Sequence, residues 1–222
     1  MHSMDKSPPL LAGLALAFLA LLQSGILQAG TLNVQVEDQD AEAVEDAVVF
    51  VRTVNSQVPA FEPMQSSVDQ VDKAFVPFVR VVTAGSEVSF PNSDDIRHHV
   101  YSFADARTFE LPLYIGTPAN PVQFDQAGAV DLGCNIHDFM RGYIYIVETP
   151  FFSKSVAGDA RLEALPEGDL ELVVWHPRLT DDQPVVQNIQ LSADAEESVS
   201  VRLELRGERG TGRAPKRRRN RY

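Results

Sequence analysis

Short runs of alternating or β-branched residues, each followed by turn-forming residues, recur along this 222-residue chain. Such runs predict strands, because successive side chains of a strand point to opposite faces of a sheet. Little of the chain shows the period of an amphipathic helix. The expected strands cover residues 31–36, 47–51, 79–82, 87–90, 99–103, 122–124, 129–132, 143–147, 160–162, 170–175, 185–191 and 198–205. The sequence therefore predicts an all-β protein made of sandwiches.

The N-terminus predicts export. Lys6 precedes an apolar run over residues 10–22, and Ala29-Gly30 supplies the small residues of a cleavage site. The run of about 13 residues is short against the roughly 20 that span a bilayer. We therefore expect residues 1–29 to be a cleaved signal peptide rather than an uncleaved membrane anchor. The resulting protein would be periplasmic or otherwise exported, with no integral membrane span.

Charge is divided unevenly along the chain. Residues 30–205 contain 29 acidic and ten basic side chains, whereas residues 206–222 contain one acidic and eight basic side chains. The acidic body argues against nucleic acid as a partner and suits docking with a basic protein surface. Residues 206–222 have no apolar periodicity and are expected to form a disordered basic tail. This tail either contacts anionic lipid or an acidic partner, or is a solvated extension.

The only cysteine, Cys134, begins a short segment that also contains His137 and Met140. His98 and His99 lie upstream, at the start of an expected strand. Each of these residue types is most often structural by itself, but two imidazoles, a thiolate and a weakly binding thioether together are the ligands of a blue-copper site. An unpaired cysteine in an exported protein also favours a metal ligand. The residues alone leave zinc open, since it prefers the same cysteine and histidine donors.

The stretch from Phe75-Val76-Pro77 to Val147 resembles the cupredoxin family, above all its amicyanin and plastocyanin members. The shared pattern consists of the Phe-x-Pro motif, the segment 84–90 leading to an asparagine, a histidine shortly before a valine, and Cys-x-x-His-x-x-Met-Arg-Gly over residues 134–142. The resemblance implies one type 1 copper site with four ligands, which are His98, Cys134, His137 and Met140.

The resemblance also chooses between the two neighbouring histidines. In the family the first ligand is followed by asparagine and valine. His98 therefore corresponds to the ligand, and His99 corresponds to the asparagine that tethers the strand to the cysteine loop. Alternation along a strand would send these two side chains to opposite faces. Further candidates for orienting the ligands or bonding to sulfur are Asn92, Ser93 and Asp94 before His98, and Asn135 and Asp138 in the cysteine loop. Ordinary turn formation is the alternative role for all of them.

A second resemblance concerns the rest of the chain. Leu165-Pro166 with Gly168 and the following strand is similar to the carboxypeptidase regulatory-like (transthyretin-like) sandwich, and the strands within residues 31–51 look like the beginning of the same module. We expect N-terminal strands over residues 30–62, a cupredoxin copper-binding domain over 63–149 and a smaller β-sandwich over 150–205. The cupredoxin domain would then be inserted into, or flanked by, a split second sandwich.

These features predict a carrier of single electrons between protein partners, with no catalytic residues. His176 stands alone in the sequence, and Gly133 and Asn135 flank the cysteine where multicopper oxidases carry histidine. Two alternatives remain open. The chain could be a periplasmic copper carrier or sensor, or a structural or interaction module whose metal ion holds the fold together.

Overall fold

The computed structural model describes residues 29–54 and 58–207, so all but the last residue of the expected signal peptide and nearly all of the basic tail lie outside it. The regular elements of the described residues are strands, which confirms the predicted all-β class. Among these residues there is no helix of the length and apolarity needed to cross a membrane. The strands are β1 (Gly30–Asp38), β2 (Val48–Thr53), β3 (Gln65–Ser67), β4 (Asp69–Val71), β5 (Ala74–Val76), β6 (Val79–Thr83), β7 (Ser86–Ser89), β8 (His98–Ala104), β9 (Arg107–Tyr114), β10 (Val122–Phe124), β11 (Gly128–Gly133), β12 (Arg141–Val147), β13 (Phe152–Lys154), β14 (Asp159–Leu165), β15 (Gly168–Trp175), β16 (Val185–Leu191) and β17 (Glu196–Leu203).

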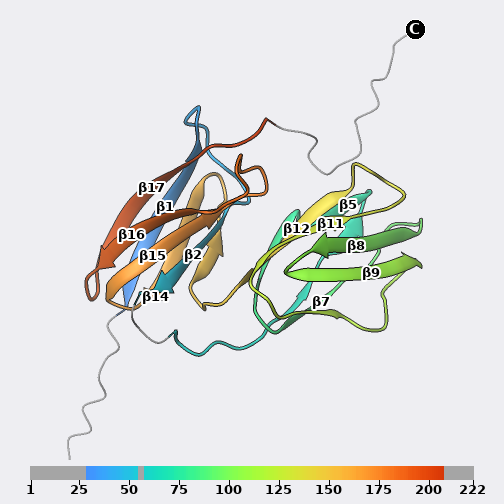
Figure 1. Cartoon of the computed structure of the whole chain (residues 1–222), viewed down its shortest axis with the longest axis horizontal. Helices are drawn as coiled ribbons and strands as arrows, with labels where there is room; N and C mark the ends of the chain where they lie inside the picture. Colours follow the sequence, from blue (N-terminus) through green and yellow to red (C-terminus); the bar gives the residue numbers. More distant parts are fainter. Residues whose placement is uncertain (1–28, 55–57, 208–222) are drawn as a thin grey trace, which may run out of the picture.

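The strands form two sandwiches that lie side by side (Figure 1). One, here called the terminal sandwich, has the sheets β14-β1-β17 and β13-β2-β15-β16. It joins the first two strands to the last five, because β1 pairs with β14 and β17, and β2 pairs with β13 and β15. The other, here called the central sandwich, has the sheets β10-β7-β3 and β6-β12-β11-β8-β9, with the hairpin β4-β5 beside them.

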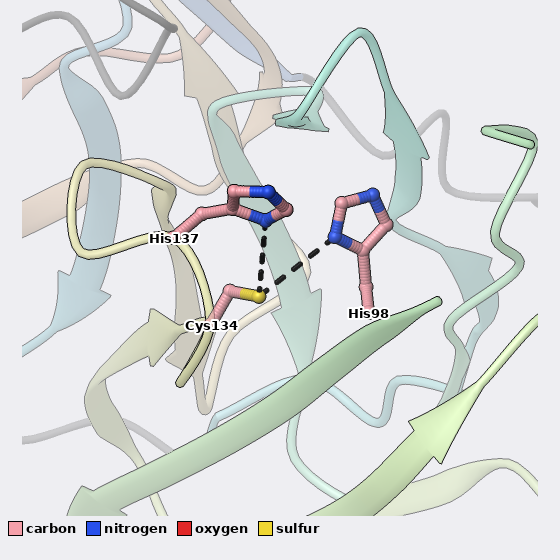
Figure 2. Close-up of side chains that lie close together, drawn as sticks. All are labelled: His98, Cys134 and His137. Atoms are coloured by element: carbon pink, nitrogen blue, oxygen red, sulfur yellow. Dashed lines mark hydrogen bonds between the residues drawn. The ribbon is translucent and has the colours of Figure 1, made fainter. Parts of the chain in front are cut away.

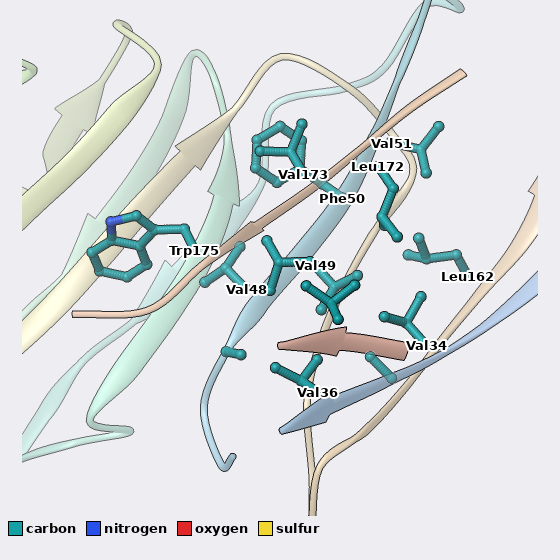
Figure 3. Close-up of a cluster of buried hydrophobic side chains, with 14 of the residues drawn as sticks. Val34, Val36, Val48, Val49, Phe50, Val51, Leu162, Leu172, Val173 and Trp175 are labelled. Carbon is teal, nitrogen blue, oxygen red and sulfur yellow. The ribbon is translucent and has the colours of Figure 1, made fainter. Parts of the chain in front are cut away.

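The core of the terminal sandwich follows from the alternation of its strands. Leu32, Val34 and Val36 of β1 are buried, while the residues between them are only partly buried or exposed. They belong to one cluster with β2 and β15 of the opposite sheet, as Figure 3 shows for Val49 and Leu172. The four consecutive residues Val48–Val51 are all buried, because both faces of β2 are covered.

The second covered face of β2 packs against the central sandwich. Val79 and Val81 of β6 and Tyr145 of β12 belong to the same apolar cluster as the terminal sandwich. The ring centroid of Trp175, in β15, lies 4.8 Å from that of Tyr145 and 6.0 Å from that of Tyr143. Continuous apolar packing therefore joins the two sandwiches and covers the β6-β12 part of the large central sheet.

The core of the central sandwich is a separate cluster that includes Phe90, Phe124, Leu132 and Ile144. Its least expected strand is β9, an eight-residue strand that the sequence analysis did not predict. β9 contains Pro112 and pairs only with β8, at the edge of the sheet, where a residue without an N–H is tolerated. The short strands β3, β4, β5 and β13 were also not predicted; three residues show little of a period, and of the three-residue strands only β10 was predicted.

Candidate metal centre

The ends of neighbouring strands bring the predicted ligands together. His98 is the first residue of β8, Cys134 directly follows β11, and Met140 directly precedes β12. β11 is antiparallel to both neighbours, with Gly133 opposite Tyr101 of β8 and opposite Arg141 of β12. Because β11 ends where β8 and β12 begin, the histidine of β8 and the loop over residues 134–140 meet at one edge of the central sandwich.

Three potential ligand atoms converge in this place. Cys134 Sγ lies 3.8 Å from Nδ1 of His98 and 3.8 Å from Nδ1 of His137. Figure 2 shows both imidazoles turning one nitrogen toward the sulfur. The three donor atoms all lie within 4.8 Å of one another. Nearly equal distances from one sulfur to two imidazole nitrogens are the arrangement of a trigonal site with two histidines and one cysteine.

The spacing fits a first-row metal ion. Such an ion binds thiolate at about 2.3 Å and imidazole at about 2.0–2.1 Å, as zinc does. With an angle of about 120° between those bonds, the sulfur and nitrogen would be about 3.8 Å apart. The two observed separations are both 3.8 Å. The donors therefore need little movement to enclose an ion, and the two distances alone do not distinguish copper from zinc.

Two tight turns shape the cysteine loop. The His137 N–H donates to Cys134 O at 3.3 Å, and the Met140 N–H donates to His137 O at 2.8 Å. These turns bend the chain back after every third residue, so Cys134, His137 and Met140 follow one another around the loop. Met140 is fully buried and belongs to the core cluster of the central sandwich with Cys134. Met140 thus lies in the same core as the cysteine, at the other end of the loop.

His98 is held from its far side by Asp94. The Asp94 Oδ2 atom lies 2.7 Å from His98 Nε2, which leaves Nδ1 facing the sulfur. Asp94 also accepts the N–H groups of Asp72 and Lys73, at 2.7 and 2.9 Å, from the turn between β4 and β5. Burial alone would raise the pKa of Asp94, but the hydrogen bonds from Lys73 and His98 outweigh it and lower that pKa. A carboxylate on the second nitrogen sets the tautomer and orientation of a histidine ligand.

Asn92 holds the loop that carries Asp94. Its side-chain amide donates to Ile96 O at 2.8 Å and to Tyr114 O at 3.0 Å, and its carbonyl accepts the N–H of Asp94 at 3.1 Å. Asn92 is buried, so its amide replaces water for backbone groups that would otherwise lack a partner. It therefore orients His98 through the loop rather than by touching the ring.

His99 and Asn135 occupy different surroundings. His99 Nε2 lies 2.8 Å from Glu110 Oε1 on β9, and its Nδ1 atom is buried without a hydrogen-bond partner in the described part of the chain. Its ring thus makes no hydrogen bond to the cysteine loop. Asn135 is exposed on that loop.

The turn at Asp72 and Lys73, whose N–H groups hold Asp94, was not predicted from the sequence. An Asp-Lys pair is not among the strong hairpin signals.

The two histidines beside the sulfur differ in exposure. His98 is fully buried, whereas His137 is partly exposed and its neighbour Ile136 is 48% exposed. Burial lowers the pKa of His137, and the positive charges of His98 and Lys73 lower it further. A metal binds the neutral imidazole, so a lowered pKa extends the pH range in which His137 is available as a ligand.

The chain is similar to part of several solved structures. A copper-containing nitrite reductase from Thermus scotoductus is 25% identical over 44% of this chain and 25% of its own, with a TM-score of 0.36. A reduced amicyanin variant is 25% identical over 36% of this chain and 80% of its own, with a TM-score of 0.34. A purple cupredoxin from Nitrosopumilus maritimus is 15% identical over 37% of this chain and 99% of its own, with a TM-score of 0.34.

The chain therefore spans about a quarter of the length of the nitrite reductase but most of the length of the two small proteins. No model of a protein family matches the chain, and no curated protein sequence does so.

Proposed function

We propose that this chain is an exported copper protein of the cupredoxin type that passes single electrons between protein partners and has no catalytic activity of its own. The observation that carries the proposal is the placing of two imidazole Nδ1 atoms at 3.8 Å from one thiol sulfur. Met140, buried at the end of the same loop, completes the donor set of a blue-copper site. Copper bound by these groups would supply a one-electron Cu(II)/Cu(I) couple.

The protein's own residues favour an electron carrier over a protein that releases its metal. His98 is fully buried and is held by Asp94, which is itself tied to the turn between β4 and β5. Cys134 is also buried, at the end of a paired strand. Ligands that are held in place resist both rearrangement and departure of the ion. A copper carrier would instead need donors that an acceptor could reach and displace.

The surface near His137 suits contact with a protein partner. Ile136 lies in the cysteine loop, and Leu113 and Ile115 flank Tyr114, the residue paired with His98. Their exposures are 48%, 51% and 57%, which makes this end of the central sandwich apolar within a strongly acidic protein. Apolar contact near the ligand and charged contact around it are both features of protein docking surfaces. We propose redox proteins as the partners and the terminal sandwich as a carboxypeptidase regulatory-like module.

The test is the visible and electron paramagnetic resonance spectrum of the full chain loaded with Cu(II). We expect an intense thiolate-to-copper band, which the Cys134→Ser variant lacks. His98→Ala should abolish the wild-type spectrum, while the neighbouring variant His99→Ala should keep it with a small shift. A spectrum typical of square-planar copper, or a blue His98→Ala variant, would contradict the proposal. Rapid transfer of Cu(I) to a competing chelator would favour the copper carrier instead.

A further inference from the structure

A hollow of about 330 Å³ lies next to the cysteine, on the outer face of the large central sheet. Its lining includes Tyr101 of β8, Asp131 and Gly133 of β11, and Arg141 and Tyr143 of β12. The buried residues Leu132, Cys134 and Met140 also border it. Along β11 and β12 its more exposed lining residues alternate with buried ones such as Val130 and Ile144.

The absence of a side chain at Gly133 shapes the hollow. A Cβ atom there would lie 2.7 Å from the ring of Tyr101, so that ring lies directly over the glycine. Tyr143 lies on the other side of the hollow. Its ring centroid is 5.4 Å from that of Phe78 and 6.0 Å from that of Trp175. Two tyrosines, one of them held in place by aromatic neighbours, thus form walls of the hollow.

The chemistry of the hollow suits a guanidinium group. Asp131 and Asp138 are both exposed and line it together with the two tyrosines. Arg141 also lines the hollow and offsets one of these two charges. Arginine stacks on aromatic faces and bonds carboxylates at the same time, which lysine does less well. The surrounding body, residues 30–205, has 29 acidic side chains against ten basic ones.

The described chain ends beside the segment that follows Trp175, a neighbour of Tyr143. After β17, Leu205 bridges to Leu179, and the backbone N–H of Arg206 donates to Arg178 O at 2.8 Å. Arg178 is three residues after Trp175, whose ring centroid lies 6.0 Å from that of Tyr143. In Figure 1 the last described residues run from β17 toward the side of the central sandwich. The described chain therefore ends on the Tyr143 side of the hollow.

We propose that the hollow receives an arginine side chain from the chain's own basic segment, residues 209–221. This segment contains six arginines and one lysine, Lys216, and no acidic residue. At no more than about 3.3–3.6 Å per residue, Arg213 can lie up to roughly 20 Å from Gly207. Tethering also raises the effective concentration of the segment to the millimolar range.

Zero-length carbodiimide cross-linking of the full chain, followed by peptide mapping, tests the proposal. Lys216 is the only lysine of the segment, which makes its cross-links specific. We expect bonds from Lys216 to Asp131 or Asp138, lost at high salt because screening weakens contacts between exposed charges. The Asp131→Asn/Asp138→Asn variant should lose them. In the matched control, Asp105→Asn/Asp125→Asn, which removes two other exposed carboxylates of the central sandwich, cross-links to the hollow should persist.

A second measurement reports on the hollow itself. Replacing the six arginines of the segment by glutamine should shift the backbone amide resonances of Tyr101, Gly133 and Tyr143 in the metal-free chain, and leave those of the β1-β14 pair unchanged. Unmoved hollow resonances would overturn the proposal, as would equal cross-linking of Lys216 to unrelated carboxylates. Cross-links that form only between two molecules would overturn the intramolecular contact. Because no copper is needed, these outcomes are independent of the proposed electron transfer.

Discussion

The two sandwiches differ in what they bury. Among the described residues, the terminal sandwich and its connections bury only three polar side chains, which are Thr149, Ser155 and His176. The central sandwich buries seven, which are Gln70, Thr83, Ser86, Asn92, His98, His99 and Ser102. Three of the seven, His98, His99 and Asn92, lie at the end of the central sandwich that holds the candidate metal centre. The buried side chains of the terminal sandwich are thus almost all apolar, whereas one end of the central sandwich buries polar groups and potential metal ligands.

This difference separates two sources of stability. Apolar burial acts whether or not a metal is present, and its loss costs most where the side chain is fully enclosed. Metal donors stabilise the fold only when an ion binds them, because the ion binds the native arrangement more strongly than the unfolded chain. The stability of the terminal sandwich should therefore not depend on metal. The stability of the central sandwich should depend on metal and on a few hydrogen bonds.

The largest effect is expected from the terminal core. Leu172 is fully buried in the apolar cluster, so Leu172→Ala should lower the free energy of unfolding by about 2–5 kcal/mol. The loss should be the same with and without copper, as measured by urea denaturation. Leu113→Ala, at a position 51% exposed, is the control and should change stability by less than about 0.5 kcal/mol. If copper abolished the destabilisation caused by Leu172→Ala, the stability of the two sandwiches would not be separate as proposed.

The next effect is a pH dependence that belongs to the terminal sandwich. Burial, then the charge of Arg178, lowers the pKa of His176 from 6.5 to about 4. Between these values the unfolded chain binds a proton that the folded chain does not, so stability falls as pH decreases from above 6.5 toward 4. The full difference is about 3 kcal/mol.

This contribution should be absent from His176→Gln, and denaturation of both proteins at several pH values would measure it. Because glutamine changes the local packing, the informative quantity is the slope of stability against pH rather than its absolute value. The same slope in both proteins would show that His176 is not the titrating group.

Copper should stabilise the chain through the central sandwich. At free copper a hundredfold above the dissociation constant, the gain in the free energy of unfolding would be about 2.7 kcal/mol. Thermal unfolding of the metal-free and loaded chain measures this gain. In Cys134→Ser the gain should fall sharply, because Cys134 Sγ is the atom that both imidazoles face. Equal melting temperatures for the wild-type chain with and without copper would count against the site.

The smallest effect sharpens the role of Asp94. Asp94→Asn keeps the shape of the side chain but weakens charge-assisted hydrogen bonds to His98 and to the β4-β5 turn, with an expected cost of about 1–2 kcal/mol. It should also shift the reduction potential of the copper-loaded chain. Asp69→Asn is the matched control, since Asp69 bonds Ser93 in the same loop but bonds neither imidazole in the described residues. Equal potentials for the two variants would show that Asp94 supports only the loop.

Much of the architecture follows from local sequence. Residues 31–36 alternate because one face of β1 is buried, and that period is visible without knowing the partner strand. The order Cys134, His137, Met140 likewise places three donors in one short loop, because two tight turns need no distant contact. By contrast, β9 could not be predicted from its own residues. It is stabilised by pairing with β8, and its Pro112 argues against a strand in isolation.

The sequence by itself determined the all-β class and the set of donors, since both depend on residue type and short-range spacing. The family resemblance had predicted His98 rather than His99 as the ligand, and the tertiary structure shows the physical basis: His98 faces Cys134 where β8 lies against the end of β11, whereas His99 contacts Glu110. Only the tertiary structure decided that Asp94 contacts His98, that a hollow lies over Gly133, and that both faces of β2 are buried. Each results from strand register and packing between segments far apart in the chain, and such contacts leave no period in the local sequence.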